Sequence, residues 1–164
     1  MYKRQSATNQ TISEYASEKL WKKLGAKHPA LWSKDKERGD EKGFCCINSN
    51  ARDFARLAKL YMRNGNWNGE QIIDSSYVSE ATSLANLIDP KGEKNDSYGM
   101  HFWIAKHKNM NIYYSRGFRG QYMICIPEKK MIVLRLGKKD GTILDCGHFD
   151  SLYALIAAAI EMYP

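Results

Sequence analysis

The chain has 164 residues, of which 43% are hydrophobic and 12% aromatic, so its composition indicates one folded domain rather than a disordered segment. Its most apolar stretch, residues 152–160, is too short for a membrane-spanning helix. The net charge of +7 comes mostly from lysines dispersed over turns and among acidic residues. A nucleic-acid footprint instead concentrates its basic residues on one face, so the charge argues against a nucleic-acid partner.

The first predicted element is a helix over residues 12–24. Thr11 and Glu14 form a capping box, in which each side chain bonds the other residue's backbone N–H. Apolar residues recur on one face as far as Leu24, and Gly25 stands where a helix commonly ends. The polar, charge-rich residues 28–42 are predicted to be a loop.

The clearest predicted helix follows Asn50, which is a good N-cap, and ends at Asn64-Gly65. Asp53 lies in its first turn, where a carboxylate meets the positive end of the helix dipole. The expected buried stripe consists of Phe54, Leu57, Ala58, Tyr61 and Met62.

After this helix the pattern predicts a turn over residues 66–69 and a short helix over residues 76–84, started by Asp74 or Ser75. Residues 86–97 are predicted to be a polar loop. β-Rich runs then cover residues 98–104, 111–115, 121–126 and 131–136, with a hairpin turn at residues 127–130. An apolar helix over residues 149–162 closes the chain and should pack on the sheet, so the fold class is α+β.

The junction of two predicted strands carries an unusual sequence, Gly117-Phe118-Arg119-Gly120. Glycine within a strand pattern marks a bulge or a place where another group approaches the backbone closely. A tight bend with an exposed arginine is the simpler interpretation, and spacing by itself leaves both open.

The cysteines and histidines show no metal-ligand spacing. Cys45 and Cys46 are adjacent, Cys125 lies in a predicted strand, and Cys146 stands apart. Metal sites use ligand pairs two to four residues apart, so we predict neither a metal site nor a cofactor. Buried free thiols are the expected state, without a disulfide.

Two short matches to catalytic motifs are rejected. Ser33-x-x-Lys36 has the spacing of a serine nucleophile and its lysine, but that chemistry needs a buried helix start and a desolvated amine. Both residues lie in an exposed, charge-crowded segment. Tyr113-x-Ser115 matches a tyrosine proton-shuttle element but falls inside a predicted strand.

Several segments together resemble the serine β-lactamase-like hydrolases, which include class C β-lactamases, DD-peptidases, esterases and 6-aminohexanoate-dimer hydrolases. The similar segments are residues 51–56, 64–69, 98–103, 116–121, 127–128 and 133–137, together with the closing helix. The resemblance covers nearly all of residues 6–164. It implies the C-terminal portion of the β-lactamase/transpeptidase-like fold.

The resemblance also implies a site. Phe118-Arg119-Gly120 falls where the family has Lys-Thr-Gly or His-x-Gly on the strand that lines the active site, so these three residues are expected to contact substrate. The backbone N–H of Gln121 is expected to be one oxyanion-hole donor, and Gly120 would let an acyl group approach. Phe118 replaces the usual cation, so a cation must come from Arg119 or Arg116. This departure favours amide or ester hydrolysis over β-lactam recognition.

The family's Ser-x-x-Lys and Tyr-x-Asn/Ser elements would lie upstream of residue 1, so no catalytic residue is assigned in this chain. Residues 1–5 resemble a translated adapter and are expected to be a non-native leader. Residues 6–164 form a partial hydrolase domain, with a helical part over 6–97 and the sheet and last helix over 98–164. The parent enzyme would act outside the cytoplasm on a small-molecule amide or ester.

Two further expectations follow. The chain alone should lack acyl-transfer activity, and the predicted strand over residues 131–136 should leave an open, apolar edge that favours self-association. The alternative is a stand-alone α+β binding module without catalysis.

Overall fold

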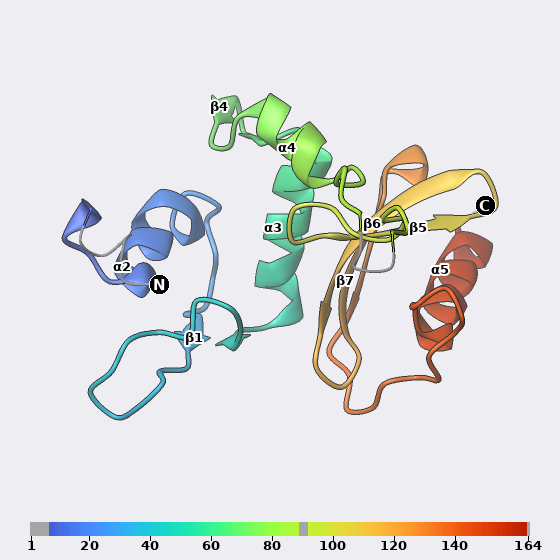
Figure 1. The fold of residues 1–164 in the computed structure, drawn as a ribbon. Coiled ribbons are helices and arrows are strands. Elements are labelled where there is room, and N and C mark those ends of the chain that lie inside the picture. The colour runs from blue at the N-terminus through green and yellow to red at the C-terminus, as the bar shows by residue number, and fades with distance from the viewer. Residues whose placement is uncertain (1–6, 89–91, 164) are drawn as a thin grey trace. The chain divides into compact units, whose positions relative to one another are not determined.

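The computed structural model describes residues 7–88 and 92–163, in which helices combine with antiparallel strands as the α+β prediction requires (Figure 1). Two compact units divide between residues 57 and 58, inside helix α3 (Ala51–Met62). The expected leader, residues 1–5, lies outside the described residues. The expected division of the domain into a helical part over residues 6–97 and a sheet part over residues 98–164 stays a prediction.

The first unit begins with the predicted capping box. The Glu14 N–H donates to the Thr11 hydroxyl over 3.1 Å, and the Thr11 N–H donates to the Glu14 carboxylate over 2.9 Å. Helix α2 (Ile12–Ala16) then passes into a π-helical segment, η1 (Ser17–Trp21). The predicted single helix over residues 12–24 therefore changes its hydrogen-bond pattern midway and ends at Trp21, earlier than expected. A turn follows over residues 22–25 and closes at Gly25, whose φ is 65°.

The expected loop over residues 28–42 contains a short strand. Strand β1 (Leu31–Trp32) pairs with β2 (Ile47–Asn48), and the Trp32 indole N–H donates to the Cys45 carbonyl oxygen over 2.9 Å. The pairing joins residues about fifteen positions apart, which local polarity does not reveal.

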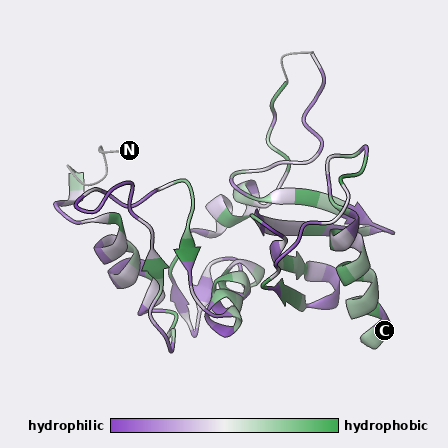
Figure 2. Ribbon diagram, turned by 90° about the horizontal axis from the view of Figure 1, so that it is seen from below, coloured by the Kyte–Doolittle hydropathy of each residue, from purple (hydrophilic) through white to green (hydrophobic). Residues whose placement is uncertain are grey.

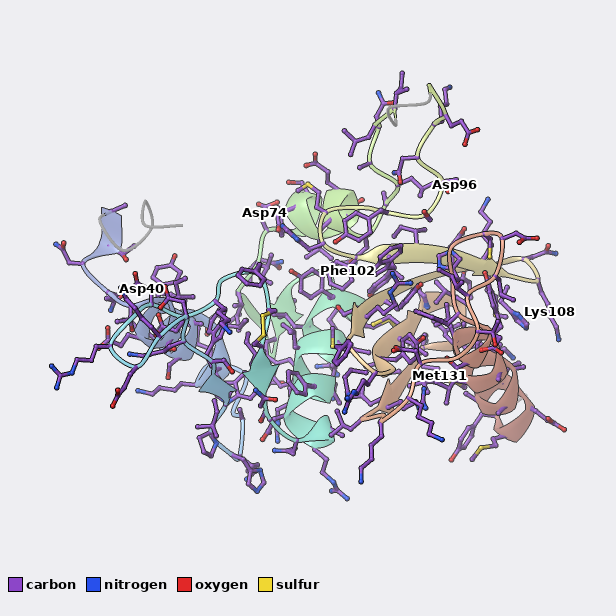
Figure 3. The ribbon with its side chains drawn as sticks, turned by 60° about the horizontal axis from the view of Figure 1, so that its bottom comes forward. Asp40, Asp74, Asp96, Phe102, Lys108 and Met131 are labelled. Carbon is purple, nitrogen blue, oxygen red and sulfur yellow. A yellow bond between two sulfur atoms is a disulfide. The ribbon has the colours of Figure 1, made fainter. Side chains whose placement is uncertain are left out.

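Cys45 and Cys46 form a disulfide, so the expectation of free thiols is wrong for this pair (Figure 3). They lie in a turn where Cys46 is exposed, and not in an apolar core. Cys125 is a buried free thiol as predicted, and burial raises its pKa to about 12. Cys146 is free but exposed.

Helix α3 starts as the sequence predicts. The Asp53 N–H donates to the Asn50 side-chain oxygen over 3.0 Å, and the Asn50 amide donates to the Asp53 carboxylate over 2.7 Å. That carboxylate is buried and also accepts the N–H groups of Lys27 and His28 at 2.9 and 3.0 Å. The hydrogen bond from Lys27 holds the pKa of Asp53 well below its usual range.

The second unit contains the rest of α3 and the remaining elements. These are β3 (Asn66–Trp67), β4 (Glu70–Gln71), α4 (Ser75–Ala81), β5 (Trp103–His107), β6 (Met110–Gly117), β7 (Gln121–Ile126), the 3-10 turn η2 (Pro127–Lys129), β8 (Met131–Arg135) and α5 (Asp150–Met162). Asp74 caps α4, and the turn predicted over residues 66–69 joins β3 to β4. The strand predicted from residue 98 begins only at Trp103, because Tyr98 turns back and bridges to Trp103.

Strands β5 to β8 form one antiparallel sheet in sequence order. Leu152 and Ile156 of α5 pack against one face of the sheet, which confirms the predicted closing helix (Figure 1). The strand residues of this core are Ala105, Ile112, Tyr114, Tyr122, Ile124 and Ile126. Hydrophobic residues accordingly concentrate in the strands and α5 (Figure 2).

On the other face lies Phe102, which is labelled in Figure 3. Its ring centre is 4.7 Å from that of Tyr61, at the end of α3, and 5.5 Å from that of Tyr113. The sheet of this unit is therefore covered on both faces. Within the described residues, no helix has the length and apolar character to cross a bilayer.

Candidate functional site

Phe118, Arg119 and Gly120 form the turn that joins β6 to β7, just beyond the last strand pair, Gly117 and Gln121. They are thus placed at the end of the strands rather than within one. Arg119 and Gly120 both have left-handed backbones, with φ of 62° and 74°. The Phe118 side chain is 81% exposed, and the Arg119 guanidinium carbon lies 5.2 Å from its ring centre. The turn therefore presents an aromatic surface and a cation to solvent.

This turn packs tightly against the residues that follow β8. A methyl group on Gly120 would lie 2.4 Å from the Lys139 carbonyl oxygen, and one on Gly137 would lie 2.4 Å from the Gly120 carbonyl oxygen. The Gln121 side-chain amide donates to the Gly137 carbonyl oxygen over 2.5 Å. Gly120 thus has a packing role in addition to its predicted role in substrate approach.

Beside the turn, β6 has an open edge, which we define as the β5-facing side of residues 115–117. Pairing with β5 ends at Tyr114, opposite Trp103, so these three residues pair only with β7. No other described segment forms a strand pair with them. An open edge exposes unpaired main-chain donors and acceptors.

The register tells which main-chain groups face this edge. The Ile104 N–H donates to the Ser97 carbonyl oxygen over 2.8 Å, away from β6, so the pair of Ile104 with Tyr113 is a non-hydrogen-bonded one. Main-chain groups alternate in direction along a strand, so those of Tyr113 point toward β7. Three residues on, those of Arg116 point to the open edge.

The same alternation places the Gln121 N–H on the side of β6, opposite Gly117. The expectation that this N–H is an oxyanion-hole donor stays a prediction, and the ladder offers it a competing acceptor. Arg116 carries the main-chain N–H that faces the open edge, and sequence reasoning alone did not identify it because it depends on register.

Of the two arginines expected to supply a cation, Arg116 is engaged elsewhere. Its guanidinium carbon lies 3.8 Å from the Trp103 ring centre and 5.1 Å from that of Phe149, and its Nη1 donates to the Gly147 carbonyl oxygen over 3.2 Å. We call this set of contacts the Arg116 clamp. The side chain therefore lies on the α5 face, and Arg119 is the arginine exposed at the turn.

A buried polar pair supports the clamp. The Tyr114 hydroxyl lies 2.6 Å from Nδ1 of His148, and both residues are almost fully buried. Burial, reinforced by the positive charge of Arg116, lowers the pKa of His148, and burial raises the pKa of Tyr114. Their separation of 34 positions in the chain left no sequence signal for the pair.

The rejected catalytic motifs occupy unsuitable places. Ser33 and Lys36 are exposed and lie outside any helix, and Tyr113 is buried in β6, where burial raises its pKa far above the usual value. Across the described residues, no three His, Cys, Asp or Glu side chains gather as a metal site would require.

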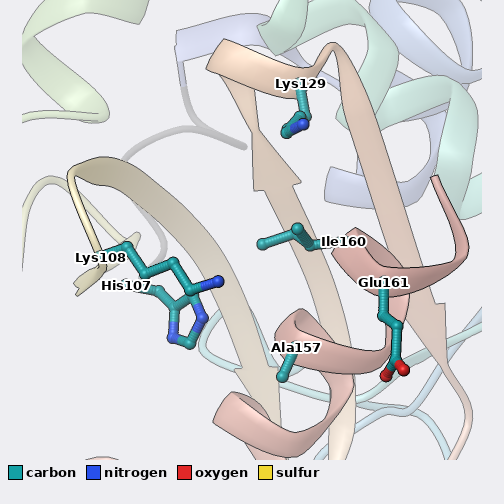
Figure 4. Close-up of a pocket in the computed structure, with 6 residues that line it drawn as sticks. All are labelled: His107, Lys108, Lys129, Ala157, Ile160 and Glu161. Atoms are coloured by element: carbon teal, nitrogen blue, oxygen red, sulfur yellow. The ribbon is translucent and has the colours of Figure 1, made fainter. Parts of the chain in front are cut away.

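A hollow of about 580 Å³, whose lining residues are drawn in Figure 4, lies by the turns that join β5 to β6 and β7 to β8, at the opposite end of the sheet from residues 118–120. Its lining consists of His107, Lys108, Lys129, Ala157, Ile160 and Glu161. It is remote along the strands from the open edge and contributes nothing to the site described here.

The arrangement matches the fold of a solved structure. A Bacillus anthracis protein that carries the provisional name 6-aminohexanoate-dimer hydrolase superposes with a TM-score of 0.76 at 24% sequence identity. The match covers 97% of this chain and 39% of that one, so the chain spans well under half the length of this relative. At this identity the likeness shows the fold alone, and it confirms the predicted fold class.

The family follows from the sequence itself. The model of the family described as Beta-lactamase matches residues 5–148, which is most of the chain. The chain belongs to the beta-lactamase family, and the resemblance inferred from its motifs is confirmed. No curated protein matches the chain.

Proposed function

We propose that this chain forms the substrate-binding wall of a hydrolase that cleaves amides or esters through an acyl-enzyme. The observation that carries the proposal is the open edge of β6 next to a turn held rigidly against β8, in a chain of the beta-lactamase family. A rigid edge suits catalysis because preorganised donors lose little energy in reorganisation when charge develops.

The substrate's amide or ester group would lie along the open edge. The main-chain N–H and C=O of Arg116 offer it a strand-like hydrogen-bonding partner. Phe118 and Arg119 would contact the groups flanking the reacting carbonyl, and Gly120 holds their turn in place. The predicted donor role of the Gln121 N–H would require its pair with Gly117 to open.

Ser33 of the rejected motif is exposed and lies outside any helix, so we propose that the chain does not itself form the acyl-enzyme. Incubation with a fluorophosphonate or penicillin probe should therefore give no stoichiometric labelling by mass spectrometry. The control is Ser33→Ala, which should behave identically. Labelling at one probe per chain that disappears in Ser33→Ala would overturn this part of the proposal.

Binding is tested separately from chemistry. The structurally similar protein takes its name from the 6-aminohexanoate dimer, so we use the linear dimer as the probe. We expect increasing amounts of it to shift the backbone NMR signals of residues 115–121 until the shift saturates. Phe118→Ala and Arg119→Ala should weaken binding. Lys129→Ala, in the β7–β8 turn at the other end of the sheet, should leave it unchanged. Uniform weakening in all three variants would argue against a site at the turn.

A non-catalytic binding module is the second candidate, and thermal melting separates it from an incomplete enzyme. The second unit's own covered sheet favours the module, which predicts a cooperative, monomeric transition. An incomplete enzyme predicts a broad or aggregating one. Among the residues that the structure describes, strand β8 pairs with β7 alone and is half-buried, so we also propose self-association through its other edge, measurable by sedimentation.

A further inference from the structure

The Arg116 clamp and the pair of Tyr114 with His148 form one continuous cluster on the α5 face. The His148 ring centre lies 6.3 Å from that of Trp103, on which Arg116 stacks, and 5.8 Å from that of Tyr114. Gly147, which accepts the hydrogen bond of Arg116, immediately precedes His148 in the chain. A change at His148 therefore acts on two of the clamp's contacts, the Trp103 ring and the Gly147 carbonyl.

The charged and titratable groups around His148 come from four segments. Strand β6 supplies Tyr114 and Arg116, helix α5 supplies the Tyr153 ring at 6.1 Å, and the segment before β5 supplies Asp96. Cys146, two residues before His148, has its sulfur 4.0 Å from the Tyr153 hydroxyl. Burial disfavours a protonated imidazole most, the charge of Arg116 adds to that effect, and the charge of Asp96 opposes it.

We propose that His148 is a proton-sensitive positioning residue for the open edge of β6. With a neutral imidazole, the Tyr114 hydroxyl and the Trp103 ring are held in place and Arg116 stays in its clamp. With a protonated imidazole, a second positive charge lies beside the guanidinium and the clamp opens.

The clamp affects the open edge because Arg116 contributes its side chain to the clamp and its main chain to the edge. The side chain of Arg116 is fixed on the α5 face while its main-chain N–H and C=O face the open edge. Releasing the side chain frees the backbone torsions of Arg116 and misaligns these groups. Functional groups need support within about 0.5 Å to stay productive, so a loosened edge binds less well.

Reciprocity makes the proposal quantitative. If clamping disfavours protonation of His148, then protonation must disfavour clamping by the same factor. If the closed clamp lowers the proton affinity of His148 tenfold, then protonation of His148 lowers the equilibrium constant for closing the clamp by about tenfold as well. Removing the cation should raise the His148 pKa toward its ordinary value.

The test is an NMR titration of the full chain between about pH 4.5 and 8, a range that brackets the ordinary histidine pKa. The ring carbon signal of His148 reports protonation, and the Nε–H of Arg116 and the indole N–H of Trp103 report the clamp. We expect all three to follow one midpoint below that of an exposed histidine. Hydrogen exchange at the Arg116 Nε–H, corrected for intrinsic rate, should rise on protonation. The size of this rise follows from the His148 midpoints measured in the intact chain and in Arg116→Met. For each pH unit between the two midpoints, the exchange rate of the Arg116 Nε–H should rise about tenfold.

Three variants decide the outcome. His148→Gln should abolish the pH response of Arg116, whereas His107→Gln, at the opposite end of β5, should preserve it. Arg116→Met should raise the midpoint of His148, and this measurement still decides if His148→Gln does not fold. An unmoved midpoint in Arg116→Met, or Arg116 signals indifferent to His148 protonation, would overturn the proposal.

The relevance of the clamp to the edge rests on the proposed function, and ligand binding separates the two. Binding of the 6-aminohexanoate dimer should weaken below the His148 midpoint. Equal affinity above and below that midpoint would refute control of the edge while leaving the binding function intact. No binding at any pH would refute the proposed function, and the clamp would then be judged by the titration alone.

Discussion

The substitution Gly120→Ala tests whether the candidate turn is fixed by packing. Two effects should lower the stability of this variant. A left-handed backbone costs an L-residue about 1–2 kcal/mol. The added methyl would also lie 2.4 Å from the Lys139 carbonyl oxygen, so backbone must move to restore an ordinary contact. Overpacking of this kind costs about 1–3 kcal/mol, so we expect a total loss of about 2–5 kcal/mol.

Gly69→Ala is the matched control. Gly69 has φ of 93° and nothing within 4 Å of an added methyl, so only the backbone cost of about 1–2 kcal/mol applies. The gain from a less flexible unfolded chain is common to both substitutions and cancels in the comparison. Urea denaturation of the full chain, followed by tryptophan fluorescence, measures both variants. If Gly120→Ala and Gly69→Ala lose the same stability, the packing argument is wrong and Gly120 faces open space.

Three further outcomes are expected. Because the pKa of Asp53 is depressed, its carboxylate contributes stability that is present above the unfolded value of about 3.9 and is lost as pH falls. Asp53→Asn should therefore lower the free energy of unfolding more at neutral pH than in acid. Parallel plots of that free energy against pH for the two proteins would contradict this. Tyr114→Phe should cost about 1–3 kcal/mol in urea denaturation by leaving Nδ1 of His148 unpaired, and an unchanged midpoint would show that this bond contributes nothing. Iodoacetamide should modify Cys146 without reductant and the Cys45–Cys46 pair only after reduction; alkylation of that pair in unreduced protein would exclude the disulfide.

Elements specified by contacts a few residues apart were predictable. The capping box of Thr11 and Glu14 and the cap at Asn50 are local patterns, and each lies where the sequence places it. The buried stripe of α3 was predicted only in part, because Ala58 is buried as expected but the fully buried Leu60 was not included. The other four expected members are only half-buried. The strands from β6 to β8 and helix α5 were equally legible, because β-rich runs, a proline turn and helical periodicity are all local signals. The π-helical segment and the β1–β2 pair were not, since neither has a distinctive local pattern.

The candidate site divides along the same line. The sequence by itself determined that Phe118, Arg119 and Gly120 were unusual, because two glycines flanking an arginine interrupt a strand pattern. Only the tertiary structure decided that Arg116 turns its side chain to Trp103 and its main chain to the open edge, and that Gly120 must pass Lys139 closely. Register, alternation and packing are properties of paired strands, so a single strand's sequence cannot specify them.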